Sequence, residues 1–207
     1  GLVGSEMCIR DSPHADGTFT LDGADSSSFS LQQWRRNVAY LPQKPMLMGD
    51  SVADTIRLPW TLAVRRADEA SAPDDHAATG KKTSARRGRF SRLFRSEQSQ
   101  AKLALPDQLI RNTLDAMGCE DIDLARAPHD LSGGQAARVS LARTLLTRPA
   151  VLLADEVDAG LDDDNADKVA SIMASAAARG MAIVRIRHRP PDGRSTRIVT
   201  LSSGRLS

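Results

Sequence analysis

The clearest hydrophobic pattern along this chain lies between residues 131 and 154, where a helical period leads into an unbroken apolar run. Apolar side chains recur at three- and four-residue spacing and so share one helix face: Val139, Ala142, Leu145 and Leu146. Pro149 ends that helix. Residues 150–154 are then wholly apolar, as in a buried parallel strand. This stretch therefore predicts a helix that leads directly into a strand of the core.

Other segments extend this pattern on both sides. Residues 37–41 and 181–186 predict further strands, and residues 106–117 return to a helical period. A helix beginning with Asp163 and Asp164, whose charges suit its N-terminal dipole, should end at Gly180.

The N-terminal part and the C-terminus predict smaller elements. Residues 17–23 alternate like a half-buried strand that ends in a turn. Ser30 and Gln33 have the spacing of a capping box, which predicts a short helix through Arg36. Residues 197–205 predict a final edge hairpin.

Composition narrows the classes of function. A chain of 207 residues suffices for one domain, or for one domain with a lobe. The net charge of +2 gives no global field for nucleic acid, and the 3% of aromatic residues leaves few platforms for stacking bases. Cys8 and Cys119 are the two cysteines, which indicates no disulfide framework and fits a reducing cytoplasm. No apolar run approaches the ~20 residues of a membrane span, so we expect a separate partner to provide any crossing.

The start of the helix after residue 131 is suited to binding an anion. Ser132 can cap the free amides of the first turn, and the glycines beside it let a ligand approach the backbone. A glycine-bearing helix N-terminus next to a hydroxyl favours phosphate above other anions.

Two carboxylates follow the apolar strand directly. Asp155 and Glu156 lie at the carboxyl end of a predicted parallel strand, where open α/β sheets bind their ligands. Mg²⁺ takes oxygen ligands, and phosphoryl transfer to water needs a base or water-orienting group nearby. The alternative is a capped surface helix beside an ordinary buried strand.

Together these residues resemble the ATP-binding cassette (ABC) ATPases. The letters LSGGQ at 131–135 match the signature of that family, and VLLADE at 151–156 matches its Walker B strand. The resemblance implies an α/β fold of the P-loop NTPase type: a mostly parallel sheet flanked by helices, with an antiparallel edge near the N-terminus. It divides the chain into an ATP-binding core, residues 13–49 and 131–207, and an inserted helical lobe, residues 50–130.

The resemblance also implies roles for the residues in the motifs. Glu156 would polarise the attacking water and Asp155 would hold Mg²⁺. The signature residues of one subunit would contact ATP held by the other subunit: Ser132, Gly133, Gly134 and Gln135.

Three further positions resemble family motifs at the ends of predicted elements. Gln43 is similar to the Q-loop glutamine, whose amide helps to bind Mg²⁺ or the attacking water. His188 resembles the switch histidine at the γ-phosphate, and Asp162 resembles the D-loop aspartate that contacts the opposite subunit. On their own, Gln43 and His188 would be taken as surface residues.

The sequence departs from the family pattern near these motifs. Val157 and Asp158 replace the usual Pro-Thr or Pro-Ser, and Arg189 stands where an aspartate is usual.

The N-terminal residues 1–12 fit no downstream pattern and lack the zones of a signal peptide. We expect them to be a non-native leader, with the native chain beginning near Pro13 and its phosphate-loop region missing. The sequence contains no match to the Walker A pattern G-x-x-x-x-G-K-[ST]; at Gly80–Thr83, Lys82 stands where the hydroxyl is needed. We therefore expect the chain alone to be inactive, and to expose apolar surface along Val151–Ala154.

A charged segment from about residue 65 to 102 looks like an insertion relative to the family. Its second half carries cations interleaved with Phe90, Leu93 and Phe94: Lys81, Lys82, Arg86, Arg87, Arg89, Arg92 and Arg95. A disordered, solvated loop is the first interpretation. The alternative is contact of residues 80–96 with anionic lipid headgroups.

These features lead to one main hypothesis. The chain would be the ATP-binding and hydrolysing subunit of an ABC transporter, with ATP and Mg²⁺ as ligands and no nucleic acid. A second cassette, identical or different, would complete the ATP sandwich, whose closing and reopening would drive a separate transmembrane permease subunit. We expect it in the cytoplasm, peripheral on the inner face of the cell membrane through that permease.

Local similarity and two alternatives refine this hypothesis. Residues 49–60 are similar to a small subfamily of bacterial ABC ATPases of the iron-export type. One alternative is a soluble ABC ATPase of DNA repair or translation, which would carry a coiled-coil insertion or a tandem cassette. Another is a non-catalytic interaction subunit, which the missing phosphate loop would permit.

Overall fold

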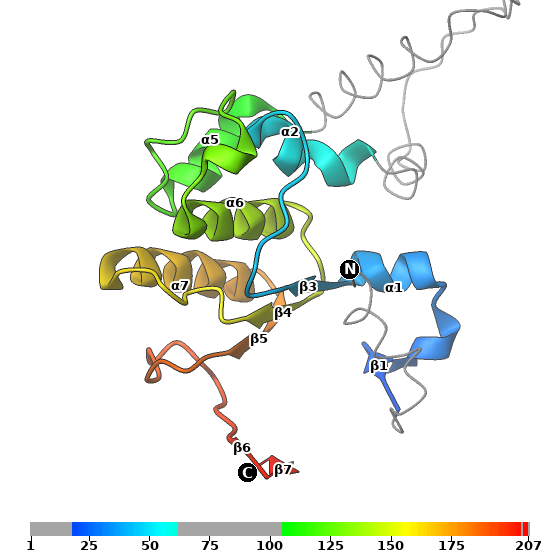
Figure 1. Cartoon of the computed structure of the whole chain (residues 1–207). Helices are drawn as coiled ribbons and strands as arrows, with labels where there is room; N and C mark the ends of the chain where they lie inside the picture. Colours follow the sequence, from blue (N-terminus) through cyan, green and yellow to red (C-terminus); the bar gives the residue numbers. More distant parts are fainter. Residues whose placement is uncertain (1–17, 62–104, 204, 207) are drawn as a thin grey trace, which may run out of the picture.

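A computed structural model describes residues 18–61, 105–203 and 205–206 (Figure 1). The predictions made for residues 1–12 and for the charged insertion at 65–102, including its proposed lipid contact, lie outside these residues.

The centre of the fold is a parallel sheet in the order β3-β4-β5. Its strands are β3 (Val38–Leu41), β4 (Val151–Asp155) and β5 (Ala182–Ile186). The register sets Leu41 beside Ala154, and Ala154 beside Arg185. All three strands therefore end at the same edge of the sheet, and the predicted parallel α/β arrangement is confirmed.

Two long helices begin at capped residues, of which Ser132 was predicted as a cap from the sequence and Asp162 was not. Helix α6 (Gly133–Leu146) starts with a capping box between Ser132 and Gln135. Helix α7 (Asp163–Ala178) starts at Asp162, whose side chain accepts the Asn165 amide. Each such cap contributes about 1 kcal/mol to a helix. The caps therefore fix where both helices begin, which is beside the loops that carry the candidate site.

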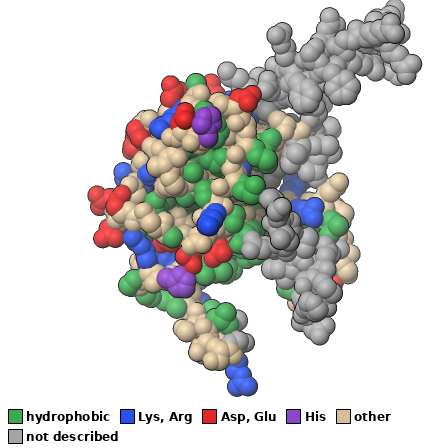
Figure 2. Space-filling model, in the orientation of Figure 1, with side chains coloured by type: hydrophobic (Ala, Val, Ile, Leu, Met, Phe, Trp, Pro, Cys, Tyr) green, Lys and Arg blue, Asp and Glu red, His purple; other side chains and the backbone are tan. Residues whose placement is uncertain are grey.

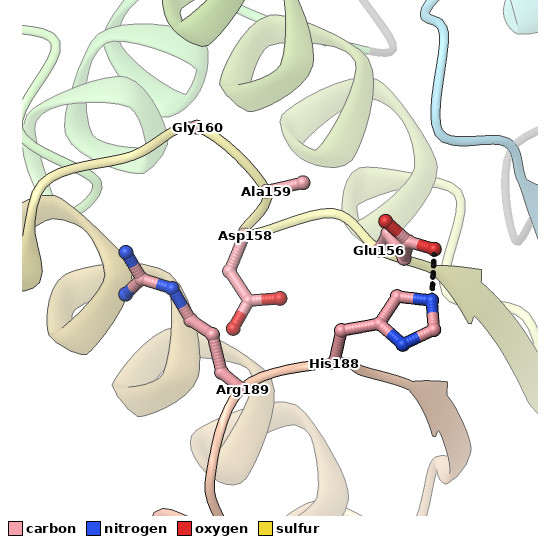
Figure 3. Close-up of a pocket in the computed structure, with 6 residues that line it drawn as sticks. All are labelled: Glu156, Asp158, Ala159, Gly160, His188 and Arg189. Carbon is pink, nitrogen blue, oxygen red and sulfur yellow. Dashed lines mark ion pairs between the residues drawn. The ribbon is translucent and has the colours of Figure 1, made fainter.

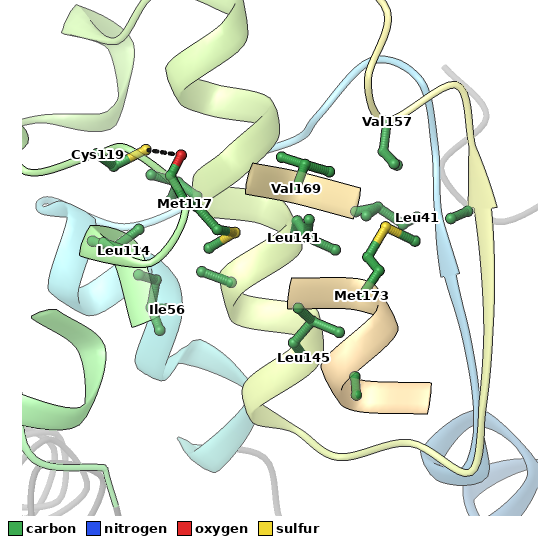
Figure 4. Packing of buried hydrophobic residues seen from close by; sticks show 14 of the residues in the cluster. Leu41, Ile56, Leu114, Met117, Cys119, Leu141, Leu145, Val157, Val169 and Met173 are labelled. Carbon is green, nitrogen blue, oxygen red and sulfur yellow. Dashed lines mark hydrogen bonds between the residues drawn. The ribbon is translucent and has the colours of Figure 1, made fainter. Parts of the chain in front are cut away.

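The hydrophobic core lies between these helices and one face of the sheet (Figure 4). Leu152 and Ala154 point into it and are 0% and 2% exposed, whereas their neighbours Val151 and Leu153 are half-buried. Across from them, the buried side chains of α6 and α7 fill the space: Val139, Leu141, Leu145, Val169 and Met173.

The expected exposure of apolar surface along Val151–Ala154 is found only in part. In β4, Leu152 and Ala154 are buried, whereas Val151 and Leu153 on the opposite face are half-buried. The exposed apolar side chains lie instead on β5, which among the described strands pairs only with β4: Val184 and Ile186 are 55% and 54% exposed. Figure 2 shows hydrophobic side chains at the surface near this strand and on the C-terminal segment below it.

The predicted helical lobe packs on α6 (Figure 1). It contains α2 (Val52–Arg57), η3 (Leu58–Thr61), α5 (Asp107–Asp115) and η4 (Pro128–Asp130). Ile56, Ile110 and Leu114 are fully buried against α6 and the loop after α5.

A buried arginine joins this lobe to the rest of the molecule. Arg138 of α6 is 7% exposed. Its Nη1 donates to the backbone carbonyls of Met117 at 3.1 Å and Gly118 at 2.8 Å, and to the side-chain oxygen of Asn165 on α7 at 2.5 Å. One side chain thus ties together the end of α5, the start of α6 and the start of α7.

The peripheral elements are short. β1 (Thr20–Leu21) and β2 (Ala24–Asp25) pair in antiparallel fashion but form a two-stranded sheet of their own instead of the predicted edge of the central sheet. The 3-10 helix η2 (Ser26–Ser28) follows them. Helix α1 (Leu31–Asn37) carries the predicted capping box between Ser30 and Gln33. None of the helices in the described ranges is long and apolar enough to cross a bilayer.

The C-terminal hairpin differs from its prediction. Only β6 (Leu201–Ser202) and β7 (Arg205–Leu206) pair, and they form a sheet of their own instead of an edge of the central one. Ile198 and Leu201 are 62% and 69% exposed. Because these apolar side chains do not pack against the described core, little holds the segment to the central sheet.

Candidate active site

Three predicted site residues follow the ends of the three parallel strands. Gln43 comes after β3, Glu156 after β4 and His188 after β5. Because parallel strands end at one edge of a sheet, these side chains emerge close together from distant parts of the sequence.

The Glu156 carboxylate joins the other two side chains. Its Oε2 accepts a hydrogen bond from Gln43 Nε2 at 2.9 Å. Its Oε1 lies 2.9 Å from Nε2 of His188 (Figure 3). The side chain of Glu156 is 22% exposed and that of His188 is 82% exposed. The carboxylate is therefore held on both oxygens and still open to solvent.

The backbone of Glu156 adopts a left-handed conformation with φ of +48°. For a residue other than glycine this costs on the order of 1 kcal/mol, and such strain concentrates at functional sites. Two hydrogen bonds hold it: the Glu156 amide donates to the Ile186 carbonyl at 3.0 Å, and the Glu156 carbonyl accepts the Ala159 amide at 2.9 Å. The turn takes the chain out of β4 and sets the carboxylate over the strand ends.

Asp155 lies beside this group at the last position of β4. Its Oδ2 accepts a hydrogen bond from the Tyr40 hydroxyl on the neighbouring strand at 3.1 Å. Mg²⁺ in phosphoryl-transfer sites takes one or two carboxylates and fills its other positions with water and phosphate oxygens. Asp155 with the nearby amide of Gln43 fits such a partial ligand set.

A pocket of about 220 Å³ opens next to the Glu156–His188 pair (Figure 3). It is lined by residues that follow β4 and β5: Glu156, Asp158, Ala159, Gly160, His188 and Arg189. Arg189 closes one side, because its Nη2 donates to the Leu161 carbonyl at 2.6 Å. The pocket therefore lies between the loop after β4 and the loop after β5.

The signature residues form a second group, at the start of α6. Ser132 Oγ accepts the Gln135 amide at 3.2 Å, and Gln135 Oε1 accepts the Ser132 amide at 3.0 Å. The other end of the Gln135 side chain donates to Asp121 at 2.7 Å. This arrangement orients the helix start and leaves it available to an anion brought by another molecule.

The two signature glycines have different surroundings. A Cβ on Gly133 would meet nothing within 4 Å, so a ligand can come close to the backbone there. A Cβ on Gly134 would lie 3.0 Å from Cδ2 of Leu161, in the loop before α7. Gly133 thus faces open space, whereas Gly134 lets α6 pack closely against the following loop.

Asp162 caps α7. Its carboxylate accepts the Asn165 backbone amide at 2.8 Å and the Asn165 side-chain amide at 2.7 Å. These two hydrogen bonds, the backbone one first, hold the pKa of Asp162 below its ordinary value. Contact of Asp162 with an opposite subunit remains a prediction.

A cluster of charged residues at the pocket was not predicted from the sequence. Asp158 and Asp192 lie between two arginines of β5 and its end, Arg185 and Arg187. The available signal was the alternation in residues 184–187, where two arginines at a spacing of two must share one face of a strand.

The chain matches the family described as ABC transporter over residues 6–159. It is 30% identical over 153 residues to the probable iron export ATP-binding protein FetA of Escherichia coli, an alignment that covers 74% of this chain and 51% of that protein. It is 34% identical over 99 residues to the energy-coupling factor transporter ATP-binding protein EcfA3 of Oenococcus oeni, covering 47% of this chain and 34% of that protein.

Solved structures show the same fold. The ATP-binding cassette MJ0796, a dimer bound to ADP and Pi in a post-hydrolysis state, superposes with a TM-score of 0.56 at 20% identity, covering 87% of this chain and 66% of that one. CbiO1 of Clostridium perfringens, part of the transporter complex cbiONQ, superposes with a TM-score of 0.52 at 19% identity, covering 82% and 55%. The chain spans about half the length of the curated relative FetA and less than two thirds of these two structures.

Proposed function

The chain belongs to the ABC transporter family, and we propose that it is an ATP-hydrolysing subunit that drives a separate membrane permease. The observation that carries the hydrolytic part of this proposal is the arrangement of Glu156. Its backbone adopts a strained left-handed conformation, and Gln43 and His188 bind the two oxygens of its carboxylate. A structural residue at a strand end needs neither that strain nor two polar partners from other strands.

Glu156 acts on the attacking water. A carboxylate that is partly open to solvent can accept a proton from water as the water attacks a phosphorus atom. His188 and Gln43 fix the direction in which the carboxylate points, and the second N–H of the Gln43 amide can donate to a phosphate oxygen or to the water. The three side chains together orient the nucleophile at the strand ends.

Asp155 and Gln43 are the groups that hold Mg²⁺. When bound, the metal neutralises the negative charge on the phosphates that would otherwise oppose attack. Tyr40 orients the Asp155 carboxylate through its hydroxyl.

The signature residues complete the site of a second cassette. Ser132 to Gln135 lie at a helix start separate from the Glu156 pocket, which supports two composite sites in a head-to-tail pair. Gly133 gives the nucleotide's phosphates a close approach to the helix start, where backbone amides and the helix dipole favour negative charge. Asp162, at the exposed start of α7, is the side chain we place against the opposite subunit.

The partner and location follow from the relatives. The EcfA3 relative is a transporter ATP-binding protein and CbiO1 is part of an ABC transporter complex, which supports our proposal of a permease partner and a position on the cytoplasmic side of the membrane. The FetA relative is a probable iron export protein, and a metal-export substrate is the class that this similarity favours.

Calorimetry with Mg-ATP tests the nucleotide chemistry. We expect negligible binding by the 207-residue chain, because no Walker A pattern occurs in it to cradle the β- and γ-phosphates. A version with a strand and a G-x-x-x-x-G-K-[ST] segment placed ahead of Pro13 should bind and hydrolyse ATP. The matched control carries the same segment with its lysine changed to alanine.

Two results would overturn this proposal. Micromolar affinity of the 207-residue chain would mean that it holds nucleotide without a Walker A loop. Equal activity of the lysine and alanine versions would mean that the added segment does not act as a phosphate loop.

A further inference from the structure

The catalytic pair, Glu156 and His188, is carried by the loops after β4 and β5. These two loops are joined by a cluster of four charged residues: Asp158, Asp192, Arg185 and Arg187. We propose that Asp158 is a positioning residue for ATP hydrolysis. Through Arg185 and Arg187 it fixes the positions of Glu156 and His188 relative to each other. This inference rests on the proposed hydrolytic role of Glu156.

Asp158 is the centre of the cluster. One of its carboxylate oxygens, Oδ2, lies 2.8 Å from Nη2 and 2.9 Å from Nε of Arg187. The same oxygen lies 3.6 Å from Nη2 of Arg185. With 3% of its side chain exposed, Asp158 is shielded from solvent, and its attraction to both arginines is only weakly screened.

Asp192 completes the cluster from the loop after β5. Its Oδ2 lies 2.7 Å from Nη1 of Arg185 and 2.9 Å from Nη1 of Arg187. Burial alone would raise the pKa of Asp192, but hydrogen bonds from the Arg185 side chain and the Arg194 backbone amide, with the positive charge of Arg185 and Arg187, outweigh it and hold the pKa below its ordinary value. Two positive and two negative groups balance inside the cluster.

Arg185 depends on these charges. Among the described residues, its Nε and Nη2 are buried without a hydrogen-bond partner, so only its ion pairs with the two aspartates compensate its burial. Removing the Asp158 charge would therefore release Arg187 and leave Arg185 poorly compensated.

The cluster and the catalytic pair are carried by the same two loops, and Asp158 lines the same pocket as Glu156 and His188. His188 follows Arg187 directly, and neighbouring residues of an extended chain point to opposite faces. Arg187 pairs with Asp158. His188 turns to Glu156 (Figure 3). Asp158 lies two residues after Glu156, so the two loops are bound to each other at two neighbouring positions.

This position explains a departure from the family pattern. Asp158 stands where the family usually has Thr or Ser, and the side chain that replaces the hydroxyl brings a charge to two arginines of the neighbouring strand. Val157 beside it is 7% exposed and anchors the same loop in the core.

The first arm of the test measures hydrolysis in the version that carries a Walker A segment. Asp158→Asn keeps the shape and removes the charge, and we expect kcat to fall about tenfold or more with KM for ATP within about twofold. Asp158→Glu, which keeps the charge, should recover part of the lost rate. The matched control is Asp167→Asn, which breaks the exposed ion pair with Arg194 at 2.7 Å and should leave kcat unchanged.

The second arm needs no nucleotide and uses the 207-residue chain. In Asp158→Asn the amide of Glu156, bonded to the Ile186 carbonyl, should show an acceleration of hydrogen exchange about tenfold larger than that of the β4 amides. If Asp158→Asn fails to fold, Arg187→Lys, which keeps the charge and loses the forked contact, takes its place in both arms.

The outcomes separate this inference from the proposed function. A parent version without hydrolysis would overturn the function, and with it the positioning role. An active parent with unchanged kcat and unchanged Glu156 exchange in Asp158→Asn would overturn the positioning role alone. A rise in KM, with exchange accelerated equally at Glu156 and throughout β4, would show that Asp158 only stabilises the fold, and would also overturn the positioning role.

Discussion

The loop after β4 carries two carboxylates two residues apart, Glu156 and Asp158, in opposite surroundings. Glu156 is 22% exposed, and one of its partners is a histidine that is 82% exposed. Asp158 is 3% exposed, and its arginine partners are 11% and 16% exposed. An exposed pair can exchange its partners for water and phosphate during a reaction, whereas a buried pair cannot. The fold therefore separates the group that reacts from the group that holds it.

The largest effect should come from the exposed carboxylate, and it should be on activity. In the version with a Walker A segment, Glu156→Gln keeps the shape of the side chain and loses the charge that polarises water. We expect hydrolysis to fall by about 10² to 10⁴-fold, while ATP-dependent dimerisation persists. Steady-state phosphate release and gel filtration measure the two properties, and hydrolysis at the parent rate would refute the role of Glu156.

The buried carboxylate should affect the stability of the fold in addition to the rate of hydrolysis. Asp158→Ala in the 207-residue chain leaves two arginines without their shared partner, which should lower the free energy of unfolding by about 3 kcal/mol. Asp167→Ala removes an exposed ion pair and should cost less than about 1 kcal/mol. Urea denaturation compares the two, and equal losses would remove the distinction between buried and exposed carboxylates.

The smallest effect should appear as a dependence on pH. Because the folded pKa of Asp192 is depressed, its ionised form stabilises the fold above its unfolded pKa of about 3.9. That contribution is lost as the pH falls through the folded pKa. The difference in unfolding free energy between the parent and Asp192→Asn should thus be constant near neutral pH and shrink below about pH 4. A difference that grows on acidification would contradict the ion pairing of Asp192.

The elements that the sequence predicted well are those in which local chemistry and burial agree. Ser132 and Ser30 have side chains suited to capping the helices that follow them, and both caps are present. The run ending in Asp155 forms the central strand because its apolar residues need cover on the face that bears Leu152 and Ala154. Membership of the ABC family, inferred from the two motifs, is confirmed.

Side-chain contacts between distant segments could not be predicted from the sequence. Arg185 within an apolar strand gives no sign of which acids it meets, because Asp158 and Asp192 become its neighbours only when the loops after β4 and β5 close over one edge. The hydrogen bond from Tyr40 to Asp155 likewise depends on the register of β3 against β4. The C-terminal hairpin was wrongly predicted at an edge of the central sheet because residues 197–201 alternate like a strand. In the described structure Ile198 is exposed and does not pack against that sheet.

Arg138 mechanically couples the helical lobe to helix α7. Its guanidinium holds the turn after α5, through Met117 and Gly118, to Asn165 at the head of α7. Asn165 in turn is held by Asp162, so a push on the helical lobe passes through one planar group to the residue that we place against a second cassette. A rotation of α5 relative to the core must either be accompanied by α7 or break these hydrogen bonds. Motion of the helical lobe is therefore coupled to the loop before α7.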